Sequence, residues 1–205
     1  MMCRDIIMAL VGGVIGFMSS LGILIAQHIF DKKGRVSIYY KFVPQFDNQK
    51  PWGVNSDSPN ETSLFIPAVF EFQNTQNITR VLRDVHASLY KGDRFVVRLR
   101  QATKTETTTK KEKEKITETT LYGTDNSSYS FVLSPRSIQK QLLEFVYTAS
   151  DKEISEKDFD TIRISYYDEK DIIVSYIAKE KIKGWKMGEQ TPNIEWIKLS
   201  KRVKK

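Results

Sequence analysis

The chain has 205 residues, of which 40% are apolar and 28% are charged, which excludes disordered and collagen-like proteins. A mean hydropathy of −0.40 excludes a protein that crosses a membrane many times. One cysteine and two histidines leave no set of ligands for a disulfide scaffold or for a zinc site with several thiolates. We therefore expect neither a metal nor a cofactor.

The apolar segment Ile6–Ala26 contains 21 residues without a charge. A helix of this length spans about 30 Å, the thickness of the hydrocarbon core of a bilayer. We predict a transmembrane anchor over residues 1–30, in the plasma membrane. The alternative is a cleaved signal peptide, but the apolar segment continues beyond the small residues Ser20 and Gly22, where a cleavage region should become polar.

Basic residues flank this segment unequally. Lys32, Lys33 and Arg35 follow it, whereas Arg4 precedes it and is offset by Asp5. Because lysine and arginine accumulate on the cytoplasmic side, this asymmetry predicts a cytoplasmic C-terminal domain. An extracellular domain is the alternative.

Within the apolar segment, Gly12, Gly16 and Ser20 recur every four residues. Residues at this spacing lie on one face of a helix, and small side chains let two membrane helices approach closely. The pattern predicts helix–helix packing, either self-association or packing in a membrane complex. The alternative is a face that contacts only lipid.

After the apolar segment, apolar and polar residues alternate in eight segments, which is typical of antiparallel strands with one buried face. The predicted strands are Val36–Val43, Leu64–Gln73, Arg80–Tyr90, Arg94–Arg100, Ser128–Leu133, Gln139–Thr148, Thr161–Asp168 and Ile172–Lys181. No helical pattern separates them, so we predict a mainly β fold: an antiparallel β-sandwich over residues 31–182. An immunoglobulin-like arrangement is the preferred topology.

Several local expectations accompany this fold. In the third strand, Val81, Val85, Ala87 and Leu89 should point inward, and His86 should be exposed. Residues 44–63 are rich in Asn, Asp, Ser and Pro and predict a loop. Residues 102–120, rich in Thr, Lys and Glu, predict a mobile loop or a hairpin arm. A helix is considered for residues 193–205.

The net charge of +7 is concentrated at the C-terminus. Residues 31–178 carry 22 basic and 21 acidic side chains, whereas residues 179–205 carry nine basic and three acidic ones. The body of the protein therefore lacks a general polyanion-binding surface, and nucleic acid is not an expected partner. The tail, residues 183–205, is either a solvated end or a contact to anionic lipid. The expected lipid contacts are Lys198, Lys201, Arg202, Lys204 and Lys205.

No catalytic motif is present: the chain has no G-x-S-x-G, no phosphate-binding P-loop and no G-x-G-x-x-G. We therefore expect no enzyme, but a membrane-anchored binding or scaffolding module with an unidentified protein partner. The first alternative is an accessory subunit that packs through its helix. Further alternatives are a surface-displayed receptor and a hydrolase that uses two carboxylates converging in a cleft.

The order of an apolar helix, then Lys33–Lys41, Phe70–Thr75 and Val81–Val85 resembles small bacterial single-span proteins with an uncharacterised C-terminal domain. The resemblance includes no catalytic or ligand motif. It therefore implies no function.

Overall fold

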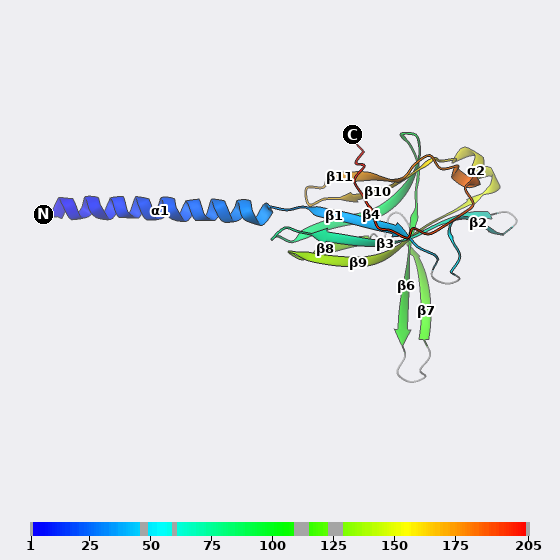
Figure 1. Cartoon of the computed structure of the whole chain (residues 1–205), viewed down its shortest axis with the longest axis horizontal. Coiled ribbons are helices and arrows are strands. Elements are labelled where there is room, and N and C mark those ends of the chain that lie inside the picture. The colour runs from blue at the N-terminus through cyan, green and yellow to red at the C-terminus, as the bar shows by residue number, and fades with distance from the viewer. Residues whose placement is uncertain (1, 46–48, 59–60, 109–114, 123–128, 204–205) are drawn as a thin grey trace.

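The computed structural model describes residues 2–45, 49–58, 61–108, 115–122 and 129–203. It begins with a single long helix, α1 (Met2–Lys32), which extends away from the rest of the chain (Figure 1). Within it, Leu10–Asp31 is long and apolar enough to span a membrane, and none of this segment is buried against the rest of the chain. The part of the chain after α1 is called the β-domain below.

The first of two antiparallel sheets is built around the long strand β3. Its strands are β1 (Val36–Phe42), β2 (Trp52–Ser58), β3 (Glu61–Asn74), β6 (Arg100–Thr108), β7 (Lys115–Tyr122), β9 (Ser137–Ser150), β12 (Glu189–Gln190) and β13 (Ile197–Lys198). Strand β9 pairs with the whole length of one edge of β3. Strands β1 and β2 lie end to end along the other edge, and β6 pairs with β9 and with β7.

The second sheet is built around β4. Its strands are β4 (Arg80–Lys91), β5 (Arg94–Arg98), β8 (Tyr129–Leu133), β10 (Thr161–Tyr167) and β11 (Ile173–Lys179). Strand β10 lies on one edge of β4, and β5 and β8 lie end to end on the other. All eight predicted segments contain strands, so the prediction of a mainly β fold with an N-terminal apolar helix is confirmed.

One hydrophobic core lies between the two sheets, and aromatic rings fill much of it. Phe70, on β3, is fully buried, with its ring centroid 5.9 Å from that of Phe72 and 6.1 Å from that of Tyr40. Leu89 and Ile164, on the second sheet, belong to the same cluster of buried residues. Alternation of apolar and polar residues along each strand produces this arrangement, because successive side chains point to opposite faces.

The predicted inward face of β4 is wrong at one end. Leu82 is buried where Val81 was expected, whereas Val85 is buried as predicted. The register shifts between these positions, and Asp84 has a φ of +55°. An extra residue in a strand forms a β-bulge and moves the later side chains to the other face. The residues that point into the core are therefore even-numbered before the bulge and odd-numbered after it.

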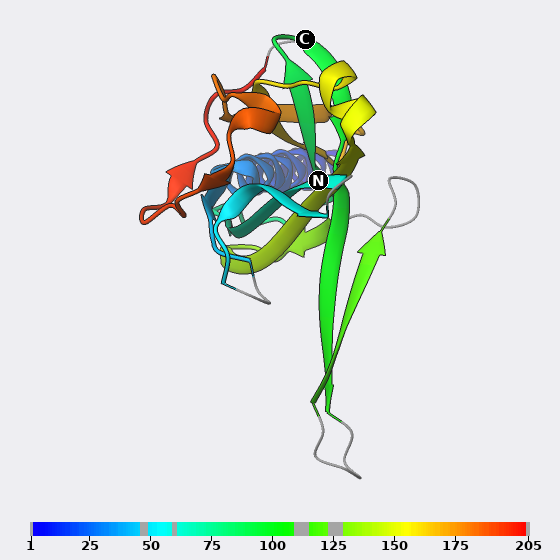
Figure 2. The same cartoon turned by 90° about the vertical axis from the view of Figure 1, so that its right-hand side faces the viewer.

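Residues 44–63 are not entirely a loop, because they contain β2. Trp52 is fully buried, its ring centroid lies 4.3 Å from that of Phe42, and its Nε1 donates a hydrogen bond to the Thr191 carbonyl. The apolar residues Trp52 and Val54 are two positions apart, as expected for one face of a strand. The polar residues around them made this short pattern hard to recognise in the sequence. For residues 102–120 the structure contains the paired strands β6 and β7, which project from the β-domain as an arm (Figures 1 and 2).

The C-terminal segment crosses from one sheet to the other. Strand β13 pairs with β1, and Arg202 pairs with Tyr176 of β11. Leu199, between these two contacts, is buried in the core. The β-domain therefore extends beyond the boundary expected at residue 182, and residues 197–203 are extended rather than helical.

The described residues of the β-domain also include two short helices. The helix α2 (Asp151–Glu156) follows β9, and the 3-10 helix η1 (Gly184–Lys186) precedes β12. Trp185 of η1 is buried, and its ring lies 5.5 Å from that of Phe159. Residues 155–159 therefore include the end of α2 and the first residues after it.

Candidate functional site

The end of α1 is attached to the β-domain by main-chain hydrogen bonds. The Asn77 N–H donates to the Asp31 carbonyl at 3.1 Å. The N–H of Thr75 donates to the Arg35 carbonyl at 3.1 Å, and the Arg35 N–H donates to Thr75 Oγ1 at 2.9 Å. The connector, Lys33–Arg35, is thus held against the turn between β3 and β4 and is not a free linker.

Gly34 makes this close approach feasible. Its φ is +117°, and a Cβ at this position would lie 2.7 Å from the Thr75 carbonyl oxygen. Glycine alone tolerates both the backbone conformation and the contact. Gln76 Nε2 donates to the Gly34 carbonyl at 3.3 Å, which adds a third connection between the connector and the turn.

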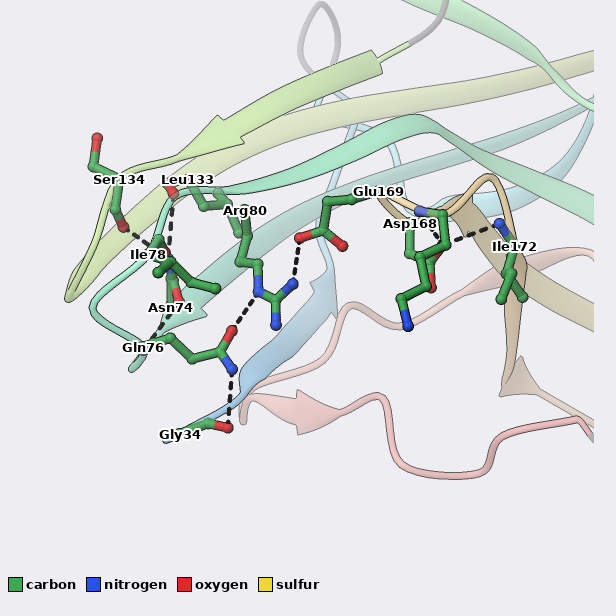
Figure 3. Close-up of polar contacts among 11 residues, drawn as sticks. Gly34, Asn74, Gln76, Ile78, Arg80, Leu133, Ser134, Asp168, Glu169 and Ile172 are labelled. Atoms are coloured by element: carbon green, nitrogen blue, oxygen red, sulfur yellow. Dashed lines mark hydrogen bonds and ion pairs between the residues drawn. The ribbon is translucent and has the colours of Figure 1, made fainter. Parts of the chain in front are cut away.

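Asn74, at the end of β3, organises this end of the sandwich (Figure 3). Its side chain is almost fully buried, and Nδ2 lies 2.8 Å from the Ile78 carbonyl, 3.0 Å from that of Ser134 and 3.2 Å from that of Leu133. Its Oδ1 accepts the Gln76 N–H at 3.1 Å. One amide therefore joins β3, the turn after it and the end of β8.

A pocket of about 460 Å³ lies beside the connector and is called the helix-proximal pocket below. Its charged lining residues are Arg35, Arg80, Lys170 and Arg202, with Asp168 and Glu169. Its apolar and aromatic lining residues are Val36, Leu82, Tyr166, Ile172, Val174 and Tyr176. Four cations and two carboxylates give the pocket a positive balance.

Both carboxylates already have partners within the pocket. Arg80 Nη1 lies 2.7 Å from Glu169 Oε1, and Arg80 Nε donates to Gln76 Oε1 (Figure 3). Asp168 Oδ1 accepts the N–H groups of Lys170 and Ile172 at 2.9 and 3.0 Å, which fixes the turn between β10 and β11.

The remaining cations lack such partners. Within the described parts of the chain, no carboxylate forms an ion pair with Arg35, Lys170 or Arg202. Burial, followed by the neighbouring Tyr176, raises the pKa of Tyr166. The hydroxyl of Tyr166 is therefore protonated at neutral pH, and the pocket offers cations and hydroxyl groups together.

A second polar cluster lies on the outer face of the second sheet and corrects the prediction for His86. His86 is buried, with 6% of the residue exposed, and not solvent-exposed as predicted. Its Nδ1 lies 2.7 Å from the Asp84 carbonyl oxygen, and Arg98 forms an ion pair with the Asp84 carboxylate. The bulge at Asp84 brings these groups against the imidazole, which sequence alternation does not foresee.

The environment of His86 predicts a pH-dependent stability. Burial lowers the pKa of His86, Arg98 lowers it further, and the main chain and carboxylate of Asp84 oppose this change. The unfolded chain then binds a proton more readily than the folded chain, so stability should fall as the pH drops below about 6.5.

We expect a His86→Gln variant to lose less stability than the wild type between about pH 6.5 and 5. Urea unfolding at a series of pH values measures this difference. Equal losses in both proteins would show that His86 titrates alike in the folded and unfolded states.

The residues of the predicted helix-packing face remain uncovered on α1. A Cβ added at Gly12 or Gly16 would have no atom within 4 Å. Ser20 Oγ donates to the Gly16 carbonyl at 2.9 Å, within the helix. This face is therefore free to receive another helix.

The predicted lipid contacts are dispersed. Lys198 Nζ lies 5.7 Å from the centre of the Tyr39 ring, and Lys201 Nζ lies 2.5 Å from Glu180 Oε2. Arg202 lines the helix-proximal pocket, and Lys204 and Lys205 lie outside the described residues.

Sequence reasoning missed the other cations of the pocket, Arg35, Arg80 and Lys170. They come from segments far apart in the chain, and no local pattern connects them. The lysine and arginine content of the sequence is the only signal, and it does not select these residues.

The acidic clusters within residues 151–160 and 168–171 are divided among structural contacts. Asp158 forms an ion pair with Lys91 at 2.7 Å, and Asp160 accepts the Gly92 N–H at 3.0 Å. In the portion of the chain that the structure describes, no group of three or more His, Cys, Asp or Glu residues could hold a metal ion.

The chain was compared with protein-family models, with curated proteins and with solved structures, and none of them matches it.

Proposed function

We propose that the protein is a single-pass, membrane-anchored binding or scaffolding module without catalytic activity. One observation carries this proposal: an uncovered apolar helix is hydrogen-bonded through its connector to a folded β-domain. Such a helix requires a bilayer or other helices around it. The fixed connector then holds one end of the β-domain at the bilayer surface.

The β-domain is proposed to be cytoplasmic and immunoglobulin-like. The basic residues after the helix favour the cytoplasmic side. The strand order β1-β3-β9-β6 in one sheet and β11-β10-β4-β5 in the other supports the topology. This order corresponds to strands A-B-E-D and G-F-C in immunoglobulin domains, with one more strand beside C. The additional strands β2, β7, β8, β12 and β13 are departures from that pattern.

The arm formed by β6 and β7 favours binding as the function. It projects from the β-domain (Figure 2), and among the described strands β6 is the one that pairs with β7. An exposed strand edge offers unpaired N–H and C=O groups to an extended segment of a partner. An accessory-subunit function is the second candidate, because Gly12 and Gly16 leave one face of α1 open to close helix packing.

The two functions predict opposite results in a capture experiment. The full chain carries an affinity tag, membranes are solubilised in mild detergent, and captured proteins are quantified against an untagged control. One variant replaces residues 102–121 with Asn-Gly, a two-residue turn that suits the paired residues Gln101 and Tyr122. The other carries Gly12→Leu and Gly16→Leu, which obstruct helix packing.

We expect the arm-deleted variant to capture about tenfold less of its partner proteins than the wild type, because a main contact is removed. The helix variant should capture them as the wild type does. The reverse result would favour the accessory subunit. Retention by both variants, or no enrichment by the wild type, would refute a binding role for the arm.

A further inference from the structure

We propose that the helix-proximal pocket binds the phosphate-bearing headgroup of an anionic phospholipid. This inference rests on the proposed anchoring function of α1 and adds a specific ligand class to it. It also replaces a diffuse attraction between the basic tail and lipid with a site at named residues.

The position of the pocket is the first argument. The span Leu10–Asp31 has 22 residues, which as a helix covers about 33 Å and matches the hydrocarbon core of a bilayer. Gly34, Arg35 and Val36 lie a few residues after the end of this span and line one side of the pocket. The hydrogen bonds from Thr75 and Asn77 keep this side against the β-domain. The pocket is thereby held in the headgroup layer, whichever side the β-domain occupies.

Charge is the second argument. Arg35, Lys170 and Arg202 line the pocket, and their side chains are exposed and form no ion pair with a described carboxylate. Arg80 is different, because Glu169 and Gln76 already hold its guanidinium group. Guanidinium groups bind phosphate through two parallel hydrogen bonds. An anionic phosphate would supply the partner that Arg35 and Arg202 lack.

The apolar lining distinguishes a lipid from free phosphate. Val36, Leu82, Ile172 and Val174 line the same pocket as the cations, and Ile172 is 48% exposed. Leu82 and Val174 are already buried in the core. A small inorganic anion would leave Ile172 and the partly exposed Val36 in water, whereas the glycerol and upper acyl segments of a lipid would cover them. The volume of about 460 Å³ is within the range of small-molecule sites.

The experiment uses the full chain in nanodiscs that contain equal amounts of phosphatidylglycerol and phosphatidylcholine. Native mass spectrometry measures which lipid stays bound after release from the nanodisc. The test variant carries Arg35→Gln and Arg202→Gln. The matched control carries Lys198→Gln and Lys201→Gln, which remove two charges of the same tail outside the pocket. A third variant, Lys170→Gln, alters only an exposed turn of the pocket and serves if the double variant is unstable.

We expect the wild type to retain phosphatidylglycerol in preference to phosphatidylcholine. Removal of two cations should reduce this preference roughly 30-fold, and the control should change it less than about threefold. Equal losses in test and control variants would indicate general charge attraction and overturn the site. Retention of added inorganic phosphate in place of lipid would overturn the lipid assignment. Absence of any preference, in a protein that still resists alkaline extraction from membranes, would refute the pocket while leaving the anchor intact.

Discussion

A Phe70→Ala variant is expected to lower the free energy of unfolding by about 3–5 kcal/mol. Phe70 is fully buried, and its ring lies within 6.4 Å, centre to centre, of the rings of Tyr40, Phe72 and Phe145. Removal of the ring would leave a cavity between two sheets. Because each sheet is fixed by its own hydrogen-bond ladders, the surroundings can collapse into that cavity only in part.

Urea unfolding of the full chain in mild detergent, followed by the circular dichroism of the strands, measures this loss. Val132→Ala is the matched control, since Val132 also lies on a strand but is 64% exposed. We expect the control to change the free energy of unfolding by less than about 0.5 kcal/mol. A Phe70→Ala protein as stable as the wild type would show that Phe70 does not belong to the core.

The strands were largely predictable from sequence because their signal is local. Alternation places one apolar face on each strand, and all eight predicted segments contain one. Two turns between strands have an equally local cause. The Lys91–Asp93 turn includes Gly92 with a φ of +59°, and Asp168 accepts main-chain N–H groups within the turn after β10. Glycine and aspartate favour such turns through their own local chemistry.

What the sequence did not predict depends on long-range contacts or on a single backbone angle. The bulge at Asp84 exchanges the two faces of β4, and it requires a φ of +55° at a residue other than glycine. That conformation is held by neighbouring strands and by Arg98, which binds the Asp84 carboxylate. Alternation therefore misplaced Val81. It assigned His86 to the correct face but could not predict that Asp84 and Arg98 lie beside it there.

The candidate site was unpredictable for a related reason. Among the described residues of the tail, the strands β12 and β13 have two residues each and Arg202 forms a single bridge. Elements this short produce no periodic pattern. The pocket requires that the tail, the connector and the turn at 168–172 meet at one end of the sandwich. Strand order determines that meeting, and strand order is not encoded in the alternation of any single segment.

The connection between α1 and the β-domain leads to the last prediction, which concerns Asn74. We expect Asn74→Ala to lower the free energy of unfolding by about 2–4 kcal/mol. The substitution would leave the Ile78, Leu133 and Ser134 carbonyls and the Gln76 N–H without the amide that now contacts them. Each unpaired buried group costs about 1–3 kcal/mol, and water entering from the pocket side should recover part of this sum.

Two further variants separate hydrogen bonding from packing. Asn74→Asp keeps the shape of the side chain but places a carboxylate oxygen against carbonyl oxygens, so it should be at least as destabilising as alanine. Asn77→Ala is the matched control: its side chain accepts one exposed hydrogen bond, from Arg136, and its removal should cost less than about 1 kcal/mol. An Asn74→Asp variant as stable as the wild type would show that the contacts between the Asn74 amide and the carbonyl groups do not stabilise this end of the sandwich.

The same variants test whether Asn74 supports the connector. Asn74 fixes Gln76, and Gln76 donates to the Gly34 carbonyl. Loss of Asn74 should therefore accelerate hydrogen exchange at the N–H groups of Thr75 and Asn77, which donate to the connector and to the end of α1. Exchange at the centre of β3 should change only as far as global stability does. Faster exchange confined to the turn would show that one buried amide determines how firmly the β-domain is attached to its helix.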